Sequence, residues 1–143
     1  MQLIARGFLL LGMLYASACG NIGASLPSSP ATCDSGAAAI LVNDASLQIL
    51  CGCDEAAGTL ASAGSALTCT LPVNSTVNFI FAGGMRNLHQ IESVGSPAFA
   101  SSPIFDPSSE APVRAHGVRF ETLATYTYRD AINHAISGTI VTR

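Results

Sequence analysis

Short runs of β-forming residues recur along most of this chain, and turn residues separate them at even intervals. Pro72, the pair Gly83 and Gly84, and Gly95 are among these breaks. Strands spaced in this way predict an all-β fold, a Greek-key β-sandwich or barrel. The expected strands cover residues 39–43, 47–51, 66–71, 76–81, 88–94, 118–123, 125–129 and 138–143.

Alternation of apolar and polar residues supports strands rather than helices. Val77, Phe79 and Phe81 fall on one face of an extended segment, as a half-buried strand requires. Residues 54–66 have helical composition, but two internal glycines favour a loop or one short turn there. Residues 95–115, rich in proline and serine, predict the long irregular connection that a Greek key needs.

The first eighteen residues have the pattern of a secretory signal. Arg6 precedes an apolar run over residues 7–15, and small residues 16–18 follow it. This run is too short for a transmembrane helix, which needs about 20 apolar residues. We therefore expect residues 1–18 to be a signal peptide and the protein to be exported.

Cys19 follows the small residues directly, and this arrangement resembles the lipobox of bacterial lipoproteins, although Ala16 stands where that motif usually has leucine. The resemblance implies that Cys19 is lipidated and anchors the protein to a membrane of the cell envelope, facing the periplasm or the cell surface. The alternative is an ordinary Ala-x-Ala cleavage site with a leftover thiol. Residues 19–36, rich in Gly, Ser and Pro, are the expected tether, and residues 37–143 the domain.

The other four cysteines form an even set: Cys33, Cys51, Cys53 and Cys69. In an oxidising compartment such a set predicts two disulfides. A Cys51–Cys53 bond would close a strained ring, so we expect Cys33 to pair with one of these two and Cys69 with the other. A four-thiolate zinc site is the rival, but Cys-Gly-Cys is tighter than the usual gap of two to four residues.

The charge of the chain argues against nucleic acid as a partner. Residues 19–143 have five arginines, no lysine and nine acidic residues, whereas phosphate binding needs a basic face. The sequence contains neither a Gly-x-Ser-x-Gly elbow nor a Gly-rich phosphate loop followed by lysine. We therefore do not expect an enzyme.

Two segments combine strands with histidines. Residues 79–91 predict a strand, a glycine turn and then His89, and residues 126–141 predict a strand, a loop with His134 and a final strand. With these features the chain, over about residues 38–143, resembles the cupredoxins, the blue-copper Greek-key β-sandwich proteins. In that family one histidine follows a mid-chain strand. A cysteine, a second histidine and often a methionine lie in the loop before the last strand.

Carried over by position, the resemblance makes His89 the first histidine ligand and His134 the second. Asp130 stands where the cysteine belongs, and Ile136 lies near the methionine position. Blue-copper electron transfer requires the copper–thiolate bond, so that function is excluded. The remaining ligands suit Cu(II) or Zn(II).

The resemblance therefore implies a copper site for metal binding or delivery, with an extracytoplasmic metal or redox partner protein. The alternative is a metal-free, disulfide-stapled binding or structural module in which both histidines are ordinary surface residues. His116 is expected to be a solvated loop residue. Met85 is either a soft fourth ligand or a side chain that fills a gap in packing.

Overall fold

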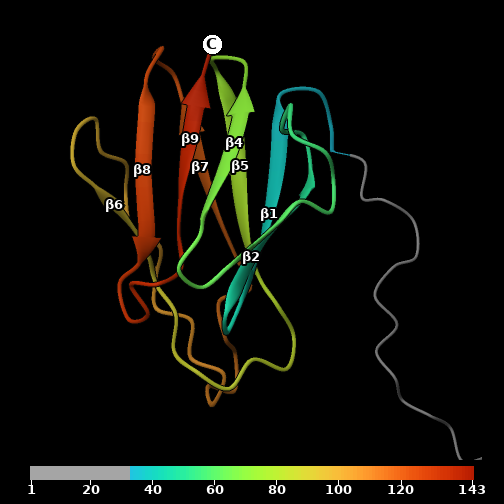
Figure 1. Ribbon diagram of the computed structural model, residues 1–143. Coiled ribbons are helices and arrows are strands. Elements are labelled where there is room, and N and C mark those ends of the chain that lie inside the picture. Colours follow the sequence, from blue (N-terminus) through green and yellow to red (C-terminus); the bar gives the residue numbers. More distant parts are fainter. Residues whose placement is uncertain (1–32) are drawn as a thin grey trace, which may run out of the picture.

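The computed structural model describes residues 33–143, which form nine β-strands in two facing sheets (Figure 1). The strands are β1 (Ala37–Asn43), β2 (Ser46–Cys51), β3 (Leu60–Ser62), β4 (Ala66–Leu71), β5 (Ser75–Phe81), β6 (Ile91–Val94), β7 (Ala115–Phe120), β8 (Thr125–Asp130) and β9 (Ser137–Thr142). Within this part of the chain no helix is long and apolar enough to cross a membrane. The expectations for residues 1–32, namely the signal peptide, lipidated Cys19 and most of the tether, lie outside the described residues.

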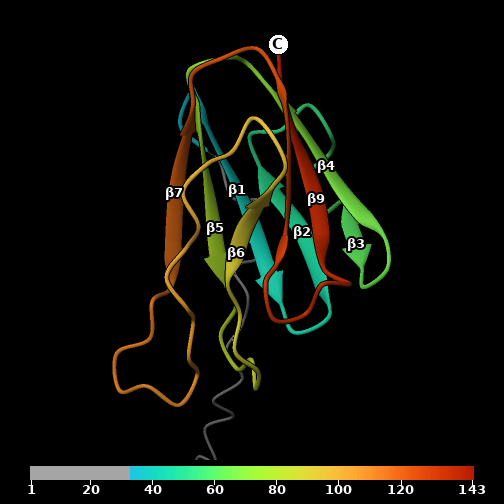
Figure 2. The same cartoon turned by 90° about the vertical axis from the view of Figure 1, so that its left-hand side faces the viewer.

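One sheet has five strands in the order β3-β2-β1-β5-β7, and the other has four in the order β4-β9-β8-β6. Each contains one parallel pair, β1 with β5 and β4 with β9, while the other pairs are antiparallel. The two layers are visible in the turned view of Figure 2. The predicted all-β sandwich is confirmed.

Alternating side chains from both sheets fill the space between the layers. In β5, Val77, Phe79 and Phe81 are buried, and the residues between them are half-buried. From the opposite sheet Tyr128 meets Phe79 edge to face, with 5.1 Å between ring centroids. Gly138 makes room for the Tyr128 ring, because a Cβ at Gly138 would lie 2.4 Å from the tyrosine oxygen.

The long connection over residues 95–114 contains no strand, as expected, but it supplies part of the core. Phe99 lies 5.4 Å from Phe120 and 6.3 Å from Phe79, measured between ring centroids. Phe105, from the same connection, stacks on Phe81 at 5.2 Å and is 1% exposed. This irregular segment is therefore packed against the sandwich.

Three predictions about the strands were wrong. Residues 60–62, expected in a loop, form the edge strand β3 beside β2. The strand expected from residue 88 begins at Ile91, because His89 instead makes an isolated bridge with Phe105. β7 begins at Ala115, so His116 is a half-buried strand residue rather than a solvated loop residue, and a ring nitrogen lies 3.0 Å from the carbonyl oxygen of Ala100.

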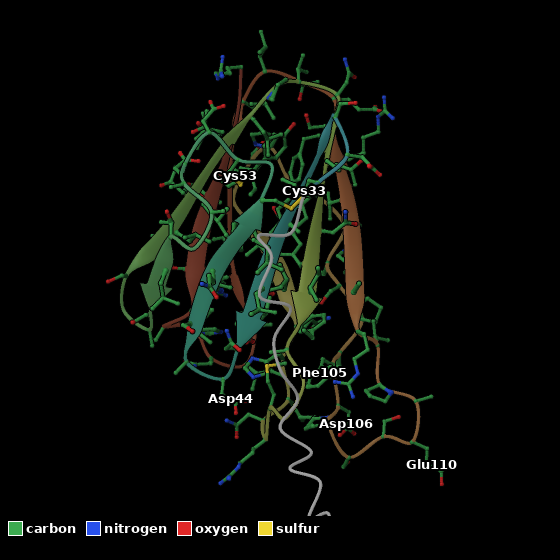
Figure 3. The ribbon with its side chains drawn as sticks, turned by 90° about the vertical axis from the view of Figure 1, so that its right-hand side faces the viewer. Cys33, Asp44, Cys53, Phe105, Asp106 and Glu110 are labelled. Atoms are coloured by element: carbon green, nitrogen blue, oxygen red, sulfur yellow. A yellow bond between two sulfur atoms is a disulfide. The ribbon has the colours of Figure 1, made fainter. Side chains whose placement is uncertain are left out.

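Two disulfides join Cys33 to Cys51 and Cys53 to Cys69. The predicted pairing is confirmed, and the zinc alternative fails because all four sulfurs are in disulfides. The second bond links the segment after β2 in one sheet to β4 in the other. Figure 3 shows Cys33 and Cys53 toward one end of the sandwich and Asp44 and Phe105 toward the other.

Candidate functional site

His89 is the centre of the site and is fully buried. It lies in the connection between β5 and β6, where its backbone exchanges two hydrogen bonds with Phe105, of 3.1 and 2.8 Å. The Phe105 ring lies beside the imidazole, with 6.5 Å between centroids. This backbone pairing with the long connection explains why the side chain at residue 89 points inward.

Asp130, the last residue of β8, is also fully buried. Its Oδ2 atom is hydrogen-bonded to Nδ1 of His89. Its Oδ1 atom accepts hydrogen bonds from the backbone N–H groups of Ile132 at 2.8 Å and Asn133 at 3.2 Å. The β8–β9 loop therefore folds around this carboxylate, as aspartate commonly arranges at a turn.

Asp44, in the turn between β1 and β2, holds the other side of the imidazole. Its Oδ1 atom lies 3.0 Å from Nε2 of His89, and its carboxylate accepts hydrogen bonds from the N–H groups of Arg86 and Asn87. The hydrogen bond with His89 is the main reason that the pKa of Asp44 is lowered, and the two backbone donors add to it. Sequence reasoning missed Asp44, because an aspartate between two strands indicates only a turn.

His134, the other predicted histidine ligand, is exposed. Its Nε2 atom lies 3.1 Å from the carbonyl oxygen of Ala131 in its own loop. The structure thus brings His89 and Asp130 into contact, while the third member of the predicted set faces a backbone carbonyl. Ile136 and Met85 are buried in the core.

Within residues 33–143, one group of three His, Cys, Asp or Glu side chains has its potential ligand atoms within 4.8 Å of one another: Cys53, Glu55 and Cys69. Both sulfurs are in the disulfide. The Glu55 carboxylate accepts hydrogen bonds from the backbone N–H and the hydroxyl of Thr70, at 2.7 and 2.8 Å. This group therefore stabilises the β4 segment and offers no thiolate.

Comparison with known proteins identifies the fold of the chain. No family model and no curated protein matches the sequence. Among solved structures, a reduced amicyanin variant superposes with a TM-score of 0.51 and 16% identity over 78% of this chain and 86% of that chain. The fold is cupredoxin-like. A purple cupredoxin from Nitrosopumilus maritimus gives a TM-score of 0.50 and 17% identity, over 77% of this chain and all of the other.

The copper that a cupredoxin fold implies does not fit the residues at this position. A histidine binds a metal through an unprotonated ring nitrogen and usually donates its other N–H to a second group. In His89 both ring nitrogens lie against carboxylate oxygens, of Asp130 and Asp44. No lone pair of the imidazole faces an open position, so the described arrangement is a histidine–carboxylate network.

Proposed function

We propose that this chain is an exported cupredoxin-like module, anchored through Cys19, that works as a metal-free binding or structural domain. The enclosure of His89 between two carboxylates carries this proposal. We do not propose a blue-copper electron carrier, because the four cysteines within residues 33–143 are all in disulfides and leave no copper thiolate there. Nor do we propose an enzyme.

The cysteines support a position outside the cytoplasm. Disulfides persist in oxidising compartments, and the four cysteines of the described domain are all paired. β1 begins at Ala37, shortly after Cys33. This order fits a signal peptide, an anchor at Cys19, a tether and then a stapled domain.

Cu(II) binding or delivery through His89, Asp130 and His134 is the second candidate function. The contact between His89 and Asp130 favours it, since a cupredoxin-like ligand set needs these two side chains together. It requires that copper displace the hydrogen bonds on His89 and that His134 leave the Ala131 carbonyl.

A Cu(II) titration separates the two functions. The exported chain, with its disulfides closed, is titrated with Cu(II) and followed by electron paramagnetic resonance, together with His89→Ala and His134→Ala variants. We expect no stoichiometric site in the native protein. One bound Cu(II) per chain that is lost in both variants would establish the copper function instead, whereas weak binding that survives both substitutions is surface binding and leaves the metal-free function standing.

A further inference from the structure

Three separate segments converge on His89 at one end of the sandwich. Asp44 comes from the β1–β2 turn of the five-stranded sheet, Asp130 from the end of β8 in the four-stranded sheet, and His89 from the connection between them. We propose that a doubly protonated His89, clamped by Asp44 and Asp130, is an ionic cross-link between the two sheets. This proposal deepens the proposed metal-free function and rests on it.

The protonation follows from which atoms face one another. A carboxylate only accepts hydrogen bonds, so a ring nitrogen that faces it must donate. The Asp44 carboxylate already accepts from two backbone N–H groups, and Oδ1 of Asp130 accepts from two more. When both aspartates are carboxylates, both nitrogens of His89 carry a proton and the ring lies as a cation between two anions.

The contribution of the His89 network to the stability of the fold depends on how deeply its side chains are buried. The side chains of His89 and Asp130 are 1% and 0% exposed, and that of Asp44 is 33% exposed. Buried polar networks stabilise a fold only when each member has its partners, and removal of one partner leaves an uncompensated buried charge. Here the backbone donors around both carboxylates complete the network.

The His89 network lies at the end of the sandwich opposite the disulfides. Toward the opposite end of the sandwich, the Cys53–Cys69 disulfide joins the segment after β2 to β4 and so ties the same two sheets covalently (Figure 3). Beyond the network, the side-chain amide of Asn133 lies 3.4 Å from the backbone oxygen of Asp44. The His89 network thus closes the end of the domain that the disulfides leave open.

The direct test is the nitrogen-15 NMR spectrum of the histidine rings in the full exported chain, with metal removed, at neutral pH. We expect both ring nitrogens of His89 to be of the protonated type and their protons to exchange slowly with water. His116 and His134, each with one ring nitrogen near a backbone carbonyl, serve as internal references. One unprotonated nitrogen on His89 would overturn the proposal.

Substitutions test the cross-link itself. Asp130→Asn keeps the shape of the side chain but removes a charge, and we expect it to lower the folding equilibrium constant by about 100-fold or more. Asp44→Asn, at the more exposed carboxylate, provides a second variant if Asp130→Asn does not fold. We expect it to lower the folding equilibrium constant by about tenfold. Asp106→Asn is the matched control, because that carboxylate contacts only its own turn.

A double-mutant cycle completes the test. We expect the losses from Asp44→Asn and Asp130→Asn to be non-additive, because both act through one imidazole. Additive losses no larger than that of Asp106→Asn would contradict the cross-link. This outcome is distinguishable from failure of the metal-free function, which the Cu(II) titration reports separately.

Discussion

Gly52 is the residue on which the close spacing of the two disulfides depends. It stands between Cys51 and Cys53 with a φ of +82°, and a Cβ there would lie 2.0 Å from the carbonyl oxygen of Ala37. An L-residue in this conformation costs roughly 1–2 kcal/mol, and overpacking adds about 1–3 kcal/mol. We predict that Gly52→Ala lowers the free energy of unfolding by about 3 kcal/mol, measured by denaturant unfolding of the oxidised protein.

Gly58 provides the matched control for this prediction. Its φ is +89°, but no atom lies within 4 Å of a Cβ built there. Gly58→Ala should therefore cost only the conformational part, about 1 kcal/mol. Equal losses in the two variants would show that the approach to Ala37 is not the cause.

Asp54 and Arg143 make the pH-dependent contact that is simplest to isolate. Arg143 donates hydrogen bonds of 2.7 and 2.9 Å to the Asp54 carboxylate and lowers its pKa below the ordinary value of 3.8. The stabilisation is therefore present above the pKa of the unfolded carboxyl and is lost as pH falls through the folded pKa. We predict that Arg143→Gln returns the Asp54 pKa, followed by carboxyl carbon NMR, toward 3.8. An unchanged titration would rule out the ion pair as its cause.

At the same scale, the sequence could place two of the three residues in the network. The resemblance aligned His89 with a histidine ligand and Asp130 with the missing cysteine, and these two side chains are in contact. Asp44 is 45 residues from His89 in sequence, and no local pattern reports such a contact. Nor could spacing reveal that His134 faces its own loop, because that depends on the conformation of the β8–β9 turn.

Among the elements, the Cys53–Cys69 disulfide has the clearest energetic role. Its sequence separation is 16 residues and its Cα atoms are 5.2 Å apart. A disulfide that closes a loop of this length is expected to contribute about 3 kcal/mol to the free energy of unfolding, because it restricts the unfolded chain. We predict that the Cys53→Ala, Cys69→Ala double variant loses about that amount in denaturant unfolding.

The Cys33–Cys51 disulfide is the comparison for this element. It closes a loop of similar size, with a separation of 18 residues, but it joins the segment before β1 to β2 within one sheet. Its removal should cost a similar amount if the entropy of the unfolded chain dominates. A much larger loss for the Cys53–Cys69 bond would instead indicate that its link between the sheets matters.

The strands were predicted correctly where apolar and polar residues alternate strongly. Prediction failed where a strand forms only because a neighbouring strand pairs with it. The β5 and β9 segments alternate clearly, so the sequence placed them within one or two residues. β3 has only three residues and exists because β2 offers an edge for it. His116 joined a strand for the same reason, because Phe79 of β5 lies opposite it in register.

On the scale of the whole molecule, the domain is a cupredoxin-like sandwich with cross-links of two kinds. Disulfides hold one end, and the network of His89 with Asp44 and Asp130 holds the other. Because His89 contacts a carboxylate through each ring nitrogen, the side chain that resembles a metal ligand is already fully engaged. We therefore expect the domain to keep its fold without metal, and its oxidised thermal unfolding temperature to be unchanged by a strong chelator. A large fall in that temperature would point to a bound metal.

The enclosure of His89 by two carboxylates is tested directly by a crystal structure of the protein soaked in Cu(II), with anomalous scattering measured at the copper edge. We predict no anomalous peak near His89, with Nε2 about 3.0 Å from Oδ1 of Asp44 and Nδ1 hydrogen-bonded to Asp130. A strong copper peak between His89 and Asp130, with the imidazole released from its carboxylate partners, would contradict this prediction.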